Sequence, residues 1–293
     1  MAAKTNPTVR RRRLGAELRR LRMASGLKST EVAERLMVSQ PKISHLENGN
    51  RTISPRDVRD LCAIYAVTDQ QVIDSLMEMA RESGQRGWWH RYGDLSDSVY
   101  IGLETDAAAI RTYEPTVIPG LLQTPAYAQA VIGETIPLLT AEQTATRLKV
   151  HLRRQHRIYD PACPLRLRAV VDEAALRRVV RSPETMREQL EHLNAFGGEP
   201  HITVQVLPYT VGAHPSLSGQ FSILAFADSP DAVVYVERFT SGLYLEKPSD
   251  VQHYSAMHDH LQARALDPAD SRDFIADAVK TYIDAAAGAL QAA

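Results

Sequence analysis

Apolar residues in the first eighty positions recur every three or four residues, in five short segments separated by polar breaks. This spacing predicts amphipathic helices, and helices this short are stable only when they pack against one another. The expected helices begin near Arg10, Ser29, Ser39, Ser54 and Thr68, and the last runs to Ser83. Ser39 is expected to cap the third helix and Thr68 the fifth. Residues 1–83 are therefore predicted to form an all-α five-helix domain, with residues 1–9 as a disordered tail.

A three-residue turn joins the second and third expected helices, which is the arrangement of a helix-turn-helix motif. Ala33 is the small residue expected in the first of these helices, and Ile43 and Leu46 face inward from the second. Gly49 follows where a helix commonly ends in glycine. The stretch from Leu14 to Leu76, with the string VSQPKISHLENG, resembles the Cro/repressor-type (XRE) helix-turn-helix family.

Two positions depart from this resemblance. Met37 stands in the turn where the family often has glycine, and Lys28-Ser29 replaces the common Thr-Gln at the start of the second helix. The resemblance implies that the third helix enters the DNA major groove and contacts base edges with its exposed side chains.

Gln40 and Ser44 lie four residues apart and are expected to share the exposed face that contacts bases. Lys42 and His45 flank that face, and the resemblance places Ser29, Asn48 and Arg51 on phosphates. For each residue the alternative is a solvated polar surface, and Glu47 is instead expected to pair with an arginine of the first helix. The expected DNA-binding set is Ser29, Ser39, Gln40, Lys42, Ser44, His45, Asn48 and Arg51.

The charge of the chain is distributed unevenly along its length. Residues 1–60 hold 14 Lys+Arg and 6 Asp+Glu, a net charge of +8. The remaining residues hold 20 basic and 29 acidic side chains, a net charge of −9. A basic segment attached to an acidic body favours a polyanion-binding module, although a solvated basic tail has the same composition.

Residues 84–99 are predicted to be a linker, and residues 100–293 an α+β domain with a mixed sheet. Helices are expected at 104–110, 125–133, 140–158, 172–180, 183–196, 248–266 and 268–290. Strands are expected at 165–171, 201–207, 220–227, 232–239 and 242–246. The strings ETDAAAIRTYEP, IPGLLQT, LPY, GAHPS and VVYVE in this region resemble the uncharacterised domain that follows an XRE module in many actinomycete regulators.

This second resemblance implies transcriptional control in development or antibiotic production, by antitoxin-like regulators encoded beside a small acidic partner protein. The segment from Tyr113 to Gln123 is a candidate partner or ligand surface, and its alternative is a tightly packed loop. The two tryptophans are either ligand-stacking residues or apolar anchors of the linker. The candidate residues are Trp88, Trp89, Tyr113, Glu114, Leu121, Gln123 and His214.

The sequence contains no HExxH, GxSxG, GxxxxGK[ST] or strand-linked GxGxxG motif, so no catalytic site, metal or cofactor is expected. His253, His258 and His260 share one expected helix, but no two of them stack at ligand spacing. The two cysteines do not form a disulfide framework, and no segment is apolar enough for a membrane span. Because the first eight residues lack the apolar core of a secretory signal, we expect a cytoplasmic protein.

We therefore expect a homodimeric, sequence-specific transcriptional regulator that binds a pseudo-palindromic operator. Its C-terminal domain is expected to dimerise and to bind a small partner protein or a ligand. The competing hypothesis is an antitoxin-like module that mainly sequesters a partner protein, with DNA binding secondary. An enzyme fused to a DNA-binding domain is a third possibility, for which the sequence offers no site.

Overall fold

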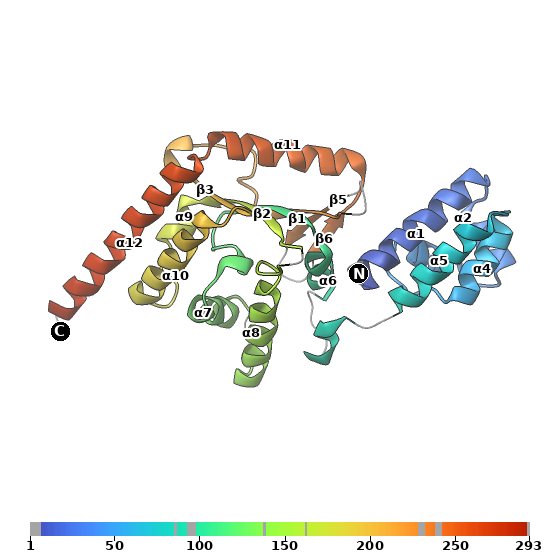
Figure 1. Cartoon of the computed structure of the whole chain (residues 1–293), viewed down its shortest axis with the longest axis horizontal. Coiled ribbons are helices and arrows are strands. Elements are labelled where there is room, and N and C mark those ends of the chain that lie inside the picture. Colours follow the sequence, from blue (N-terminus) through green and yellow to red (C-terminus); the bar gives the residue numbers. More distant parts are fainter. Residues whose placement is uncertain are drawn as a thin grey trace. The chain divides into compact units, whose positions relative to one another are not determined.

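The computed structural model describes residues 7–84, 87–92, 98–136, 139–161, 163–227, 232–237 and 242–291. For residues 7–10, 82 and 285–291 it describes the backbone alone. Contacts divide the chain into two compact units, Met1–Asp106 and Ala107–Ala293 (Figure 1). We call them the N-terminal and C-terminal units. Of the expected linker at 84–99, residues 85–86 and 93–97 lie outside the described residues.

The N-terminal unit begins with the five helices that the apolar spacing predicts, which confirms the all-α domain. They bury one core, in which Leu14, Leu18, Val32 and Leu61 are at most 2% exposed. Residues 1–6 of the expected tail lie outside the described residues, and the first helix already begins at Pro7. The elements are α1 (Pro7–Ala24), α2 (Ser29–Arg35), α3 (Gln40–Glu47), α4 (Pro55–Ile64) and α5 (Gln70–Ser83), followed by η1 (Trp88–Tyr92) and α6 (Ser98–Asp106).

The first four helices end in the same way. After each, one residue adopts a positive φ: Gly26 (73°), Met37 (53°), Gly49 (67°) and Ala66 (57°). In each case the next amide donates to the carbonyl five residues back, as Val38 does to Ala33 at 2.9 Å. This is the Schellman motif, whose left-handed position favours glycine because a Cβ is strained there. Met37 and Ala66 carry that strain.

We expect Met37→Gly to raise the free energy of unfolding by about 0.5–1 kcal/mol. Relief of the left-handed strain outweighs the extra backbone entropy of glycine in the unfolded chain. The Met37 side chain is 92% exposed, so little packing is lost with it. Urea unfolding followed by circular dichroism measures the change. Met37→Ala keeps the Cβ and should leave stability nearly unchanged; equal stabilisation by both substitutions would contradict this explanation.

The helix starts agree only in part with the sequence. Ser54 caps α4 as expected, since its hydroxyl accepts a hydrogen bond from the Asp57 amide. Ser39 is the N-cap residue of α3, but its hydroxyl accepts no bond from the described helix backbone. The prediction that Thr68 caps the fifth helix is wrong. Asp69 caps it, because its carboxylate accepts from the amides of Gln71 (2.9 Å) and Val72 (3.4 Å).

The C-terminal unit contains a six-stranded mixed sheet with the strand order β3-β2-β1-β4-β5-β6. The first three strands in that order are parallel, and β4, β5 and β6 continue the sheet antiparallel to their neighbours. This arrangement confirms the predicted α+β class. The strands are β1 (Ala109–Glu114), β2 (Arg166–Asp172), β3 (Ile202–Leu207), β4 (Phe221–Ala225), β5 (Ala232–Glu237) and β6 (Gly242–Leu245).

Helices cover both faces of this sheet, with α11 on one side and α7, α8 and α10 on the other (Figure 1). The crossover from β1 to β2 contains α7 and α8, and that from β2 to β3 contains α9 and α10. The bounds are η2 (Gly120–Leu122), α7 (Pro125–Thr135), α8 (Ala141–Gln155), α9 (Glu173–Arg177), α10 (Pro183–Ala195), η3 (Phe196–Gly198), η4 (Tyr209–Val211), α11 (Pro248–Arg264) and α12 (Pro268–Gln291).

The expected helix at 104–110 is wrong. Helix α6 ends at Asp106, and β1 begins at Ala109 as a central strand. It pairs with β2 on one side and β4 on the other, with Thr112 opposite both Ala169 and Ser222. The alanine run favours a helix locally, and the two flanking strands override that preference.

Helix α11 packs on the sheet through a buried histidine, His258, which is 0% exposed. Its ring lies 6.4 Å from that of Phe221, centre to centre. Burial, followed by the nearby Arg111 guanidinium, lowers the pKa of His258 to about 4. The folded protein therefore holds this ring neutral.

We expect the C-terminal unit to lose about 2–3 kcal/mol of stability between pH 7 and pH 4.5 through this one group. An unfolded histidine titrates near pH 6.5, so below that pH the unfolded chain binds more protons than the folded chain. The contribution is complete above pH 6.5 and falls as the pH approaches 4. Hydrogen exchange of the β1 and β2 amides, corrected for intrinsic rates, measures it. His258→Phe should remove most of this pH dependence, and an unchanged dependence would assign it to other groups.

Candidate nucleic-acid interface

Helix α3 presents one buried and one exposed face. Ile43 and Leu46 are 1% and 2% exposed and form part of the bundle core. Gln40, His45 and Asn48 are exposed on the opposite side. This division follows from the 3.6-residue period of the helix, and it leaves one polar side available to a partner.

The backbones of α1 and α3 approach closely where two glycines lie. A Cβ at Gly15 of α1 would lie 2.6 Å from the carbonyl oxygens of Leu46 and Glu47. A Cβ at Gly49, just after α3, would lie 2.7 Å from the Arg12 Cα. Any larger side chain at either position would push the end of α3 away from α1.

An ion pair stabilises the same contact. Arg22 Nε and Nη2 donate to the two carboxylate oxygens of Glu47 at 2.6 and 2.9 Å, and Nη1 donates to the Leu27 carbonyl at 2.8 Å. The two side chains are 14% and 8% exposed, and the hydrogen bond to Glu47 raises the pKa of Arg22. The predicted pairing of Glu47 with an arginine of the first helix is thus present.

Three of the predicted DNA-binding residues meet on the outer side of the motif. The Gln40 amide nitrogen donates to the Ser44 hydroxyl at 3.0 Å and to the Ser29 hydroxyl of α2 at 3.3 Å. These bonds hold the Gln40 amide over the junction of the two helices. Ser39, His45 and Asn48 are also exposed.

Lys42 and Arg51 lie on a different side of α3. Both line an open concavity of about 540 Å³, together with the first turn of α4 and the end of α5. Sequence reasoning placed Lys42 beside Gln40 and Ser44, whereas the structure brings it to the loop that carries Arg51. Gln40 and Ser44 are therefore separated across the helix from the cationic side chains of Lys42 and Arg51.

The candidate residues of the C-terminal unit are partly brought together. The Tyr113 hydroxyl lies 3.3 Å from both His214 Nε2 and the Asp172 carboxylate, at the carboxyl ends of β1 and β2. Asp172 also caps α9, because its side chain accepts a hydrogen bond from the Ala174 amide. Burial raises the pKa of the adjacent Glu114 to about 8.

The segment from Ile118 to Thr124 is a packed loop held by three glutamine amides. Gln123 donates to the Ile118 carbonyl at 2.7 Å, Gln189 to that of Leu122 at 2.8 Å, and Gln155 to that of Gly120 at 3.1 Å. Its apolar side chains are also buried, with Leu121 6% exposed. The expected ligand surface at Leu121 and Gln123 is therefore replaced by interior packing.

The surroundings of the two tryptophans support their interpretation as apolar anchors over that as ligand-stacking residues. Trp89 is 2% exposed and its ring lies over Gly87, where a Cβ would be 2.3 Å from it. Trp88 is half-buried and contacts the rings of Trp89 and Tyr92 edge-on, at centre distances of 5.8 and 6.1 Å. The pair anchors η1 and leaves little surface for stacking a ligand.

Comparison with protein-family models accounts for both units. A model described as a helix-turn-helix domain matches residues 13–76, and one described as a domain of unknown function (DUF5753) matches residues 98–277. The second match covers more than half of the chain. The chain belongs to the DUF5753 family. Its helix-turn-helix domain supports a DNA-binding regulator. No curated protein and no solved structure gave a significant match.

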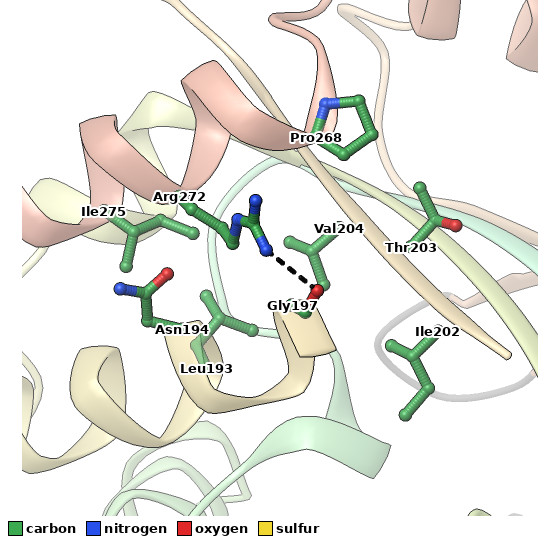
Figure 2. Close-up of a pocket in the computed structure, with 9 residues that line it drawn as sticks. All are labelled: Leu193, Asn194, Gly197, Ile202, Thr203, Val204, Pro268, Arg272 and Ile275. Atoms are coloured by element: carbon green, nitrogen blue, oxygen red, sulfur yellow. Dashed lines mark hydrogen bonds between the residues drawn. The ribbon is translucent and has the colours of Figure 1, made fainter. Parts of the chain in front are cut away.

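One cavity of the DUF5753 domain lies between the end of α10, β3 and the start of α12 (Figure 2). Arg272 extends across it, and its guanidinium donates to the Gly197 carbonyl at 3.2 Å. The cavity volume is about 50 Å³, whereas sites for small-molecule ligands typically measure about 300–1,000 Å³. This cavity has room for waters rather than for a metabolite.

Two further features are absent from the described residues. Within them, no three His, Cys, Asp or Glu side chains gather as a metal site would require. No helix in that part of the chain is long and apolar enough to cross a bilayer.

We expect Gly15→Ala to destabilise the helix-turn-helix domain by about 1–3 kcal/mol. Alanine normally stabilises a helix interior relative to glycine by about 0.5–1 kcal/mol, but here its Cβ would overlap two carbonyl oxygens. Scanning calorimetry of the full chain measures the change. The matched control is Gly133→Ala in α7, where a Cβ meets open space. That variant should be slightly stabilised, and the same sign for both would contradict the close-contact argument.

Proposed function

We propose that this DUF5753 protein is a sequence-specific transcriptional regulator that binds DNA as a homodimer. The observation that carries the proposal is how α3 is held and what it exposes. The buried Arg22–Glu47 ion pair fixes the end of this helix to α1. The outer side of α3 presents the Gln40 amide, already oriented by two serine hydroxyls.

The chemistry of that outer side suits base recognition. A glutamine amide can bond adenine through two atoms in the major groove, and a serine hydroxyl can donate to or accept from several bases. Ser29, Ser39, His45 and Asn48 on the outer side of the motif, and Lys42 and Arg51 across α3 from them, are proposed to contact base edges or phosphates. Phosphate contacts position the protein, while the Gln40–Ser44 pair selects the sequence.

We propose that the DUF5753 domain joins two chains and binds a small partner protein or a ligand. The resemblance to actinomycete regulators supports a role in development or antibiotic production, with a small acidic protein as the partner. For a ligand, the supporting feature is the meeting of Tyr113, Asp172 and His214 at the carboxyl ends of parallel strands, which is where open α/β sheets bind ligands.

We expect selection from a random duplex library to yield a pseudo-palindrome with half-sites about one helical turn apart. Gln40→Ala and Ser44→Ala should each weaken binding to that site by roughly 1–3 kcal/mol and relax the preference at one or two base pairs. Because Gln40 and Ser44 are hydrogen-bonded to each other, the double variant should lose less than the sum of the two.

The control for this experiment is Gln71→Ala, which removes an exposed glutamine from the start of α5. It should leave affinity and sequence preference unchanged. A selected site whose base preferences are the same for the wild type, Gln40→Ala and Ser44→Ala would rule out α3 as the sequence-reading element. Enrichment of single half-sites would argue against the homodimer.

A further inference from the structure

The open concavity beside α3 is built from the start of α3, the loop and first turn of α4 that follow it, and the end of α5. Lys42 comes from the first turn of α3, Arg51 from the loop after it, and Arg81 from the last turn of α5. Asp57, in the first turn of α4, is the one carboxylate among its lining residues. The side chains of this groove therefore carry a net charge of +2, and the groove opens to solvent.

The backbone adds to this positive character. Helix α4 begins in the groove, with Ser54 as its N-cap and Pro55 at its first position. The N-terminus of a helix favours anions because its first amides and its dipole point outward. Ile53, which is 1% exposed, is part of the bundle core, so the groove lies on packed structure.

Arg81 is a lining residue of the groove that lies outside the helix-turn-helix motif, near the end of α5. It pairs with Glu78 at 2.6 Å across one helical turn. Both side chains are more than half exposed, at 54% and 58%, and exposed pairs of this kind contribute little to stability. A phosphate can therefore replace Glu78 as the partner of Arg81 at small cost.

We infer that this groove holds the DNA backbone beyond the bases that α3 contacts, and that Arg81 extends the phosphate-binding surface from α3 and its loop to the end of α5. The inference rests on the proposed function and adds a contact to it. Lys42 and Arg51 contact the nearer phosphates, and Arg81 neutralises one that lies outside the half-site. Arg81 contributes affinity and salt dependence without sequence preference.

The test measures binding of the full-length protein to the selected operator at a series of salt concentrations. Fluorescence anisotropy of the labelled duplex is the readout. Each neutralised phosphate contributes about 0.9 to the slope of log K against log salt. Arg81→Gln should lower that slope by about 0.9 for each half-site engaged and weaken binding equally for matched and mismatched sequences. On a duplex cut at the edges of the half-sites, wild type and Arg81→Gln should bind alike.

Two further variants make the result specific. Arg20→Gln removes the same charge from a matching pair, since Arg20 and Glu17 lie 2.6 Å apart across one turn of α1, and it should leave the slope unchanged. Glu78→Gln releases Arg81 from its carboxylate and should strengthen binding. Both substitutions break the same ion pair, yet Arg81→Gln should weaken binding and Glu78→Gln should strengthen it. A loss of helix stability cannot explain changes in opposite directions.

The outcomes separate this inference from the proposed function. If Arg51→Gln lowers the slope and Arg81→Gln does not, the groove does not extend to α5, and the regulator proposal stands. If Arg20→Gln lowers the slope as much as Arg81→Gln, the effect is general charge and the inference fails. If the wild type binds no duplex with a salt-dependent affinity, both the inference and the proposed function are overturned.

Discussion

The close contact between α1 and the end of α3 is the constraint on which the exposed side of α3 depends. Helix α3 has only eight residues, and a helix of that length has no stability of its own in water. Gly15 and Gly49 let the two backbones approach within contact distance, and Arg22 then reaches both oxygens of Glu47. Together they fix the rotation of α3 about its axis, and that rotation decides which side chains face outward.

The buried ion pair contributes specificity of arrangement more than stability. Removing water from both charges offsets most of their attraction, so an apolar pair of similar size is often as stable. An apolar pair, however, tolerates many rotations, whereas a guanidinium and a carboxylate that share two hydrogen bonds tolerate few. With Arg22 also bonded to the Leu27 carbonyl, the pair joins the end of α1, the following loop and the end of α3.

The sequence predicts the first unit well because its signals are local. Helix periodicity and the glycine after α3 follow from residues close together in the chain. The DUF5753 domain depends on partners distant in sequence. Strand β1 lies between β2 and β4, and its alanine-rich start carries no local sign of that position. The contact between Tyr113 and His214, one hundred and one residues away, likewise depends on how the strands are arranged.

The same reasoning explains why the conspicuous IPGLLQT segment is structural. A loop that runs through the interior must satisfy its backbone carbonyls without water. Here the amides of Gln123, Gln155 and Gln189 do so. Two of these glutamines lie in helices far along the chain, so sequence alone could not distinguish a packed loop from a ligand surface. A distinctive motif marks strong local constraint, and that constraint is met here by packing.

Two arginines among the first sixty residues are taken up by ion pairs with glutamates. Arg22 is committed to Glu47 inside the bundle, and Arg20 is paired with Glu17 on the surface of α1. What matters for binding is where the remaining cations gather. Lys42 and Arg51 lie across α3 from Gln40 and Ser44. In the proposed complex with DNA, phosphate contacts would come from the first two residues and base contacts from the other two. Affinity and specificity could then change independently, because each would depend on different residues.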